Sequence, residues 1–463
     1  MQHPTPRIAI VGAGASGILL AGALQAGRAP VDLVLIDPAP GRGVAYSDRR
    51  PLHLLNTRVG NMSLERGSPE DFHRWLAAHA PRPEGWTADD FAPRALFGDY
   101  LEARLNRLQA DGVRVVREAA QAAEATAEGW SVRLASRQRL AADVLVLATG
   151  WARPRPLLFH GRDEIEPVVQ DDPWSGGAVE RLGSGAQVLL VGTGLTALDV
   201  AVSAWRLAPD CRVFAVSRHG MLPRVHASPT AAAPALSPPY PTTARELYAK
   251  LRAAAEFVEG DGSLTHGVFL GLRNVAAEIW AGLPLSERLI FLRHFRRYWD
   301  VERHRVPPAQ AEAVSAAAAA GRFTVLRGRL AEVHGLAGDA ARVSVSTRDG
   351  PKPLEVQALV NCTGPEQDPF RSRNPVILDL LAQGRASADP LGLGLKVDDD
   401  CAVIGEGGRP TSGLFAIGPP TQGQFFEVTA VPEIRLQAER LAARLGASAR
   451  ERPAPQLSSV AGG

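Results

Sequence analysis

Two stretches of the chain share one pattern of apolar and polar positions. Residues 7–27 read RIAIVGAGASGILLAGALQAG, and residues 186–205 read AQVLLVGTGLTALDVAVSAW. Each begins with a short aliphatic and β-branched run, continues through glycines, and then spaces its apolar residues as a helix does. A further apolar run follows each stretch, at residues 31–37 and 211–218. The pattern predicts a strand, a tight turn, a helix and a second strand, twice.

The similarity between the two halves continues beyond these predicted strand–helix–strand units. In each half, a third strand is followed by a small β meander and by a strand ending in Thr-Gly. The segments are 112–120, 130–136 and 142–150 in the first half, and 321–330, 341–350 and 358–364 in the second. The sequence therefore predicts an α/β fold with two dinucleotide-binding, Rossmann-like domains of one plan.

Insertions separate the second and third strands of both halves, at residues 38–100 and 219–320. The second insertion has helical patterns from Ala244 onward, and Gly321 is placed to end the last of its helices. A strand at 413–418 and a helix from about Thr429 to Leu445 close the chain. We expect an FAD-binding domain (1–165 and 356–447), an NADPH-binding domain (166–355, with a helical insertion at about 240–320) and a flexible tail (448–463).

Composition narrows the choice of function. The 463 residues carry a formal net charge of +2 and form no basic stripe, which argues against a nucleic-acid partner. The three cysteines, Cys211, Cys362 and Cys401, are scattered and include no C-x-x-C, so we expect buried thiols and no structural metal. No apolar run is long enough to cross a bilayer, and a strand by Arg7 leaves no room for a secretory signal. We therefore expect a cytoplasmic protein.

The first glycine cluster has the spacing of a dinucleotide fingerprint. Gly12 permits the tight turn, Gly14 lets the backbone approach a pyrophosphate, and Gly17 lets the helix pack on the strand. The helix N-terminus, with Ala15 and Ser16, offers N–H groups to phosphates. Asp37 ends the next strand, where an acid holds a ribose hydroxyl. We expect FAD here, with Thr149 and Gly150 also in contact.

The second cluster, Gly192-Thr193-Gly194-Leu195-Thr196-Ala197, has alanine at the third glycine position. Its next strand ends in Ser217 and Arg218, with no acid. An acid would repel a 2′-phosphate, whereas an arginine accommodates one, so the pattern favours NADPH over NADH. The alternative is that Arg218 is a solvated loop arginine. The neighbouring His219 could sense the same phosphate.

Two dinucleotide folds in one chain imply two nucleotides and hydride transfer between them. Disulfide reductases of this architecture need a redox dithiol, which this chain lacks. The electrons must therefore reach oxygen, a small molecule or a protein.

Several further segments carry a family resemblance, and together they cover about residues 5 to 445. They are LHLLNTRVGNMS from Leu52, FHRWL from Phe72, DPW from Asp172, SRHGMLPRVH from Ser217, WDVERHRVPP from Trp299 and GQFFEVTAVPEIR from Gly423. The set resembles bacterial FAD/NAD(P)-binding proteins that include FAD-dependent urate-hydroxylase-type enzymes. It is similar, more distantly, to the flavin N-hydroxylases of ornithine and lysine. The resemblance implies a monooxygenase that consumes NADPH and O2 and oxidises a small molecule through a C4a-(hydro)peroxyflavin.

The resemblance also implies positions around the flavin. Asn56 to Met62 would lie beside the isoalloxazine, while His53 would either face the flavin or support the loop. Residues 424–431 match the flavin-edge motif. Thr429, Ala430 and Val431 open a helix whose end would stabilise negative charge on the reduced flavin.

The resemblance leaves other roles less defined. An Asp common after the last strand is replaced by Pro419, so the backbone of Gly418 would serve the ribityl chain. Phe425 and Phe426 would either wall the substrate pocket or pack in the core. Arg303, His304 and Arg305 would either grip an anion or form a solvated helix end. No general base is predicted.

Two other functions compete with the monooxygenase. One is an NAD(P)H-dependent reductase or dehydrogenase that inserts no oxygen. The other is a flavoprotein that senses redox state without catalysis, which gives a second nucleotide domain little purpose.

Overall fold

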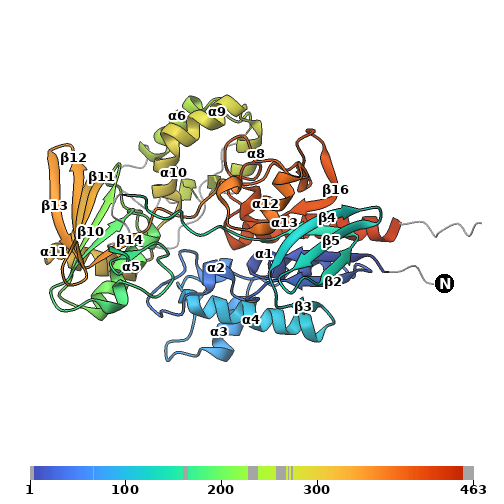
Figure 1. Ribbon diagram of the computed structural model, residues 1–463, viewed down its shortest axis with the longest axis horizontal. Coiled ribbons are helices and arrows are strands. Elements are labelled where there is room, and N and C mark those ends of the chain that lie inside the picture. Colours follow the sequence, from blue (N-terminus) through green and yellow to red (C-terminus); the bar gives the residue numbers. More distant parts are fainter. Residues whose placement is uncertain are drawn as a thin grey trace, which may run out of the picture.

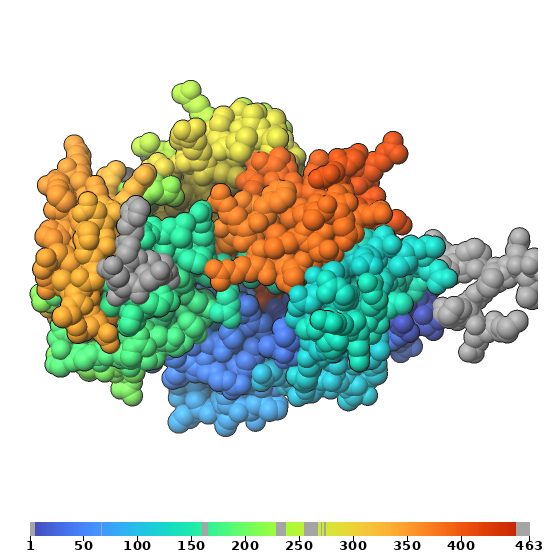
Figure 2. All heavy atoms as spheres, viewed as in Figure 1, coloured from blue at the N-terminus to red at the C-terminus, as the bar shows by residue number. Residues whose placement is uncertain are grey.

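The computed structural model describes residues 5–65, 67–159, 165–227, 238–256, 267–269, 271–272 and 275–451. Two sheet-based units lie side by side, with the helices of the second insertion above both (Figure 1). The first unit is at the right of the view and the second at the left. The space-filling view of this face is hollowed where blue, green and orange segments meet (Figure 2).

The first unit has a six-stranded sheet in the order β15-β16-β7-β1-β2-β3. Its strands are β1 (Arg7–Val11), β2 (Asp32–Ile36), β3 (Arg114–Val116), β7 (Val144–Leu147), β15 (Ala402–Ile404) and β16 (Pro410–Ala416). A separate three-stranded antiparallel sheet contains β4 (Ala120–Thr126), β5 (Gly129–Leu134) and β6 (Arg139–Ala142). β1 pairs in parallel with both β2 and β7. The predicted βαβ opening and meander of the first half are confirmed.

Helices cover this sheet and fill the first insertion. They are α1 (Ala15–Ala26), α2 (Gly43–Tyr46), α3 (Asp71–His79), α4 (Arg94–Ala110) and α12 (Pro375–Ala382). α1 packs between the sheet and the C-terminal helix α13 (Val431–Glu451). α13 begins two residues later than expected and continues to Glu451, so the prediction of a flexible tail from 448 is wrong for its first residues. The rest of that predicted tail lies outside the described residues.

The second unit has a seven-stranded sheet in the order β13-β12-β11-β10-β9-β14-β8. Its strands are β8 (Val169–Gln170), β9 (Gln187–Val191), β10 (Arg212–Ser217), β11 (Phe323–Leu336), β12 (Ala340–Thr347), β13 (Gly350–Val356) and β14 (Ala358–Asn361). Helices α5 (Leu195–Leu207) and α11 (Pro308–Ala319) pack together in this unit. The meander here is not a separate sheet, because β11 continues through a bulge at Leu330/Glu332 into pairing with β12.

The expected domain boundary at 355/356 needs correction. β14 pairs with β9 and β8, so residues 358–361 belong to the second sheet and not to the first unit. The repeated pattern places residues 358–364 in the second half, and the boundary at 355/356 is at odds with it. We place the boundary after Asn361, and the rest of the domain division stays a proposal.

The second insertion is helical, as predicted. It contains α6 (Ala244–Glu256), α8 (Ala276–Gly282), α9 (Leu285–Ile290), a π-helical turn (Phe291–Phe295) and α10 (Arg296–Arg303). Gly321 ends the last helical segment with φ +69°, a conformation that glycine adopts without strain. None of the described helices is both long and apolar enough to cross a membrane.

Candidate nucleotide-binding site

The turn after β1 can only be made with glycines. Gly12 has φ +108°, and a Cβ there would lie 2.2 Å from the Ala148 carbonyl oxygen. A Cβ on Gly17 would lie 2.0 Å from the Gly12 carbonyl oxygen. A Cβ on Gly14 would lie 3.2 Å from the Gly43 Cα, so the loop after β2 closes directly over the fingerprint. Gly12 and Gly17 thus serve the turn and the close helix packing that the sequence predicted, and the approach of Gly14 to a pyrophosphate stays a prediction.

The turn after β9 repeats this geometry. Gly192 has φ +129°, and a Cβ there would lie 2.2 Å from the Cys362 carbonyl oxygen. Its N–H donates to Val216 at 2.8 Å, just as the N–H of Gly12 donates to Ile36 at 2.9 Å. The Cys362 carbonyl after β14 therefore has the same position beside Gly192 that the Ala148 carbonyl after β7 has beside Gly12. The two nucleotide-binding turns are equivalent in the backbone.

A cavity of about 650 Å³ opens over the first turn, and we call it the nucleotide cavity. Its volume falls within the range of about 300–1,000 Å³ that is usual for ligand sites. From the first unit it is lined by the fingerprint, the loop after β2 and the loop after β7. From the second unit it is lined by Pro173, Trp174, Thr196, Gly364 and Pro365. One cavity thus connects the first fingerprint with Thr196 of the second.

Most of the predicted FAD-contacting residues line this cavity: Gly12, Gly14, Ala15, Ser16, Asp37, Thr149, Gly150 and Thr429. The Thr149 hydroxyl is buried and has no hydrogen-bond partner among the described residues. An unpartnered buried hydroxyl is costly unless a ligand or water completes it. The glycine approaches, the helix N-terminus and this hydroxyl fit a bound dinucleotide, and a contact of Thr149 with it stays a prediction.

Asp37 shapes the turn as well as lining the cavity. Its carboxylate accepts the N–H of Ala13 at 2.8 Å through one oxygen and that of Ala39 at 2.8 Å through the other. These hydrogen bonds orient the Asp37 carboxylate toward the loop that covers the fingerprint. Its contact with a ribose stays a prediction.

Sequence reasoning missed several cationic and aromatic residues of the cavity. Arg42, Arg94, Arg117 and Trp174 line it. Arg42 is buried and forms ion pairs with Asp99 and Glu102, which hold the covering loop against α4. Arg94 lies 5.1 Å from the Trp174 ring centre and 3.2 Å from Asp199 of α5. Arginines scattered over an insertion carry no periodic signal, so only the fold brings them together.

His53 does not line the nucleotide cavity, which corrects its assignment as an FAD contact. Its side chain is fully buried, and both ring nitrogens have protein partners. Nδ1 bonds to Asp48, and Nε2 bonds to the Ser203 hydroxyl of α5 at 2.6 Å. The Trp174 ring meets the imidazole edge-on at 5.7 Å between centres. His53 therefore joins the loop of the first unit to a helix of the second.

Three further contacts fasten the same loop to the second unit. Arg50 donates to the Pro173 carbonyl at 3.0 Å, and Arg58 donates to the Ala227 carbonyl at 2.7 Å. The backbone carbonyl of Asn56 bonds to His226 at 3.0 Å. Asn56 thus lies at the junction of the units and is absent from the lining of the nucleotide cavity.

Other predicted flavin-adjacent residues lie in the core. Met62 is 2% exposed and packs in the apolar cluster beneath α1, together with Val431. Phe426 is 5% exposed and stacks on Trp280 with 4.4 Å between ring centres. These positions correct Met62 and Phe426 as flavin-edge contacts, because neighbouring side chains enclose them. Phe425 is half-buried and lines a different cavity, beside Val428.

The backbone at the end of β16 is also more constrained than expected. The Gly418 N–H donates to the buried Gln437 side chain at 2.7 Å, so that group is engaged within the protein. Gly418 has φ +76°, and a Cβ there would lie 2.4 Å from the Ser16 hydroxyl. Its role is to bring β16 against the fingerprint helix. Ala430 lies between Thr429 of the cavity and the start of α13, and its cofactor contact stays a prediction.

At the second fingerprint, the polar side chains bond to one another. The Thr193 hydroxyl donates to the Met221 carbonyl at 2.6 Å and lies 2.9 Å from the Ser217 hydroxyl. The Ser217 hydroxyl accepts the Gly220 N–H at 3.0 Å. Thr193 and Ser217 therefore fix the loop after β10 close to the Gly192–Gly194 turn, and Gly194 faces open space.

The end of β10 is strongly basic. Burial lowers the pKa of His219, and the positive charges of nearby arginines lower it further. These arginines are Arg297, Arg218, Arg327 and Arg329. Arg218 is exposed and comes from the predicted position, whereas the other three come from α10 and β11 and were not foreseen. The arrangement provides a concentrated positive field beside the second turn.

The remaining candidates have structural partners. Arg303 pairs with Glu427 at 2.9 Å, and Arg305 pairs with Glu302 at 2.9 Å. His304 lies 3.7 Å from Asp300. All three cysteines are free and buried, as predicted, and burial raises the pKa of Cys211 to about 11 and of Cys401 to about 12. Thiols in this state are inert, which excludes them as a redox pair.

Comparison with known proteins agrees with the class that this geometry defines. Residues 9–152 match a family model described as FAD-NAD(P)-binding. The match confirms the class of nucleotide-binding domain predicted for the N-terminal segment.

The particular relatives are more distant. The uncharacterized protein YdhS of Escherichia coli (strain K12) is 27% identical over 216 residues, or 42% of this chain. The chain matches 39% of the length of that relative. Among solved structures, ornithine hydroxylase from Pseudomonas aeruginosa superposes with TM-score 0.63 at 16% identity, covering 96% of this chain and 99% of the other. The cadaverine monooxygenase DfoA from Erwinia amylovora gives TM-score 0.66 at 13% identity, covering 95% and 94%. At these low identities the superpositions show a shared fold and nothing more.

Proposed function

We propose that this chain is an FAD- and NADPH-dependent oxidoreductase that acts as a monooxygenase on a small molecule, with O2 as its second substrate. The observation that carries the proposal is the nucleotide cavity, which runs from the first fingerprint to Thr196 of the second. A nucleotide on each turn would extend its redox-active end into a space shared by both units. Bound FAD would supply the chemistry by accepting a hydride and passing electrons to oxygen.

The protein's own contribution is binding and positioning. The helix N-termini at Gly14 and Gly194 present N–H groups to phosphates. Thr149 offers its buried hydroxyl, and Trp174 and the loop after β14 close the cavity from the second unit. The contacts of His53, Arg50 and Arg58 hold the two units at a fixed separation, which a hydride transfer requires.

Two observations support oxygen, and not a protein disulfide, as the electron acceptor. The three cysteines are buried and unpaired, so the chain cannot relay electrons through a dithiol. The superposed structures named above are an ornithine hydroxylase and a cadaverine monooxygenase. An N-hydroxylase is therefore the first subclass to test. The oxygen-inserting step stays a prediction.

The basic end of β10 supports NADPH over NADH. Arg218→Ala is expected to raise the KM for NADPH on the order of 10-fold or more, because a charge-assisted contact with a phosphate contributes about 1.5–3 kcal/mol. The KM for NADH should change little, since NADH has no 2′-phosphate. Steady-state oxidation of both nucleotides would measure this, with Arg206→Ala, at an exposed arginine in the last turn of α5, as control. Equal effects on both nucleotides would remove the 2′-phosphate assignment.

Oxygen use distinguishes the monooxygenase from the alternative reductase. FAD-loaded protein should consume NADPH and O2 with H2O2 as the main product when no substrate is present. A panel of primary amines and amino acids should contain at least one compound that lowers H2O2 release per NADPH oxidised and appears as an oxygenated product by mass spectrometry. NADPH oxidation that proceeds fully with an artificial acceptor but ignores O2 would favour the reductase.

A further inference from the structure

A second cavity, of about 460 Å³, adjoins the nucleotide cavity, and we call it the linker cavity. It lies where two connecting segments run side by side: residues 151–156 after β7 and residues 366–374 after β14. Ala152 and Glu366 form an antiparallel bridge between the segments. The two cavities share residues 149–154 and Pro419 in their linings. Nothing in the proposed hydride transfer uses the linker cavity.

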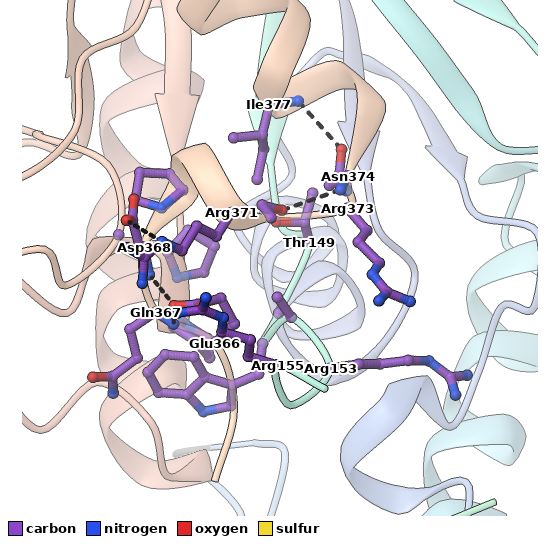
Figure 3. A pocket seen from close by; sticks show the side chains of 18 of the residues that line it. Thr149, Arg153, Arg155, Glu366, Gln367, Asp368, Arg371, Arg373, Asn374 and Ile377 are labelled. Atoms are coloured by element: carbon purple, nitrogen blue, oxygen red, sulfur yellow. Dashed lines mark hydrogen bonds and ion pairs between the residues drawn. The ribbon is translucent and has the colours of Figure 1, made fainter. Parts of the chain in front are cut away.

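The lining of the linker cavity is rich in arginine. Arg153 and Arg155 come from the first segment, and Arg371 and Arg373 come from the second (Figure 3). Glu366 and Asp368 are the carboxylates among the described lining residues. The four guanidinium groups therefore exceed the carboxylates of the lining and give it a net positive charge.

The lining carboxylates are engaged by their own segment. Glu366 accepts the backbone N–H groups of Gln367 and Asp368, both at 3.0 Å. Asp368 accepts the Phe370 N–H at 3.0 Å and lies 3.4 Å from the Arg371 guanidinium. Arg371 thus has an ion-pair partner within its own segment. Backbone N–H groups of that segment orient both carboxylates.

Two of the arginines have no such partner. Arg153 pairs with Asp172 outside the lining, but Arg155 and Arg373 form no ion pair with any described residue. Thr149 lies in the wall shared with the nucleotide cavity, and its hydroxyl belongs to that cavity. A concave site with unneutralised cations raises the local concentration of anions. Guanidinium forks match carboxylate and phosphate oxygens with paired hydrogen bonds.

We propose that the linker cavity binds a small polyanion, with two or three carboxylate or phosphate groups, that bridges Arg155 of the first segment and Arg373 of the second. Two or more anionic groups let one molecule contact arginines of both segments. The volume suits a small molecule. Because the segments join the two units, the bound anion fixes the path of both connections at once. The site is independent of which reaction the nucleotide cavity performs.

Isothermal titration of FAD-loaded protein in low salt, without NADPH, tests the proposal. The probes are citrate and pyrophosphate, with acetate at matched ionic strength as the monovalent reference. At least one polyanion should bind more than 10-fold more tightly than acetate. Stronger citrate binding identifies carboxylates as the preferred groups, and stronger pyrophosphate binding identifies phosphates.

Variants locate the binding. The double variant Arg155→Gln/Arg373→Gln should weaken polyanion binding at least 10-fold while retaining FAD, and Arg348→Gln should bind as the wild type does. Both altered arginines are exposed, so the fold should tolerate the change. The proposal is overturned if neither polyanion binds better than acetate, if the double variant binds as the wild type does, or if Arg218→Ala alone removes binding.

Discussion

Gly12→Ala is expected to yield protein that purifies without FAD. The new Cβ would lie 2.2 Å from the Ala148 carbonyl oxygen, at a φ of +108° that alanine adopts only with strain. Overpacking of this kind costs about 1–3 kcal/mol and the backbone strain about 1–2 kcal/mol more. Relief would require β7 to move away from β1, which displaces Thr149 from the cavity. The flavin absorbance per protein in purified samples measures how much FAD is retained. The affinity for FAD should fall more than 100-fold.

The repeated geometry offers a matched control. Gly192→Ala meets the same obstacle at the Cys362 carbonyl, also at 2.2 Å, but in the second unit. It should keep FAD and lose NADPH-dependent reduction. Gly194→Ala, whose Cβ would meet nothing within 4 Å, should keep both. Retention of full FAD by Gly12→Ala, or loss of FAD from Gly192→Ala with NADPH binding intact, would contradict the assignment of the two turns.

His53→Ala is expected to lower the free energy of unfolding by about 1–3 kcal/mol, because the buried Asp48 carboxylate and the Ser203 hydroxyl each lose a hydrogen-bond partner. Burial alone would raise the pKa of Asp48, but hydrogen bonds from His53 and Arg50 outweigh it and lower that pKa well below its usual value. Arg50 stays paired with the Asp48 carboxylate at 2.8 Å in this variant, so the loss falls on the contacts of His53 alone. Urea denaturation monitored by circular dichroism measures the change.

Two controls refine this experiment. His79→Ala, at an exposed position, should change stability little. Since the pKa of Asp48 in the folded state lies below about 3.9, its value in unfolded chains, the carboxylate stabilises the fold above that pH and its contribution is lost as the pH falls. Asp48→Asn should therefore lose less stability on acidification than the wild type. An unchanged acid profile, or a wild-type unfolding curve for His53→Ala, would show that the cluster does not hold the units together.

The sequence predicted the repeated elements well, because local signals govern them. Strand periodicity, the Gly12 and Gly192 turns, and the Gly321 helix stop are all properties of short segments. The same repeat placed β14 in the second half, as the structure does, and only the domain boundary drawn before it was wrong. Met62 lies in the core and not at the flavin edge, and Phe426 takes the core alternative that the sequence left open, because neighbouring side chains enclose both. Trp280, which stacks on Phe426, lies in the helical insertion.

The cationic sites were the least predictable. Arg218 was found because its position after a strand has a known meaning for nucleotide binding. Arg297, Arg327 and Arg329 reach the same place from α10 and β11, which only long-range packing brings there. The linker arginines are separated by more than two hundred positions along the chain, so no spacing rule connects Arg155 with Arg373.

The strand order of the first sheet has a consequence for biosynthesis. β16 lies between β7 and β15, and α13 packs against α1, so the first unit needs the last segments of the chain. The second sheet uses only strands from Val169 to Asn361, all translated earlier. On the ribosome, the second unit can therefore complete its sheet before α13, the C-terminal partner of the fingerprint helix α1, has been synthesised. A chain stalled or truncated before Pro410 should contain a folded second unit and an N-terminal segment exposed to proteases, and it should load no flavin.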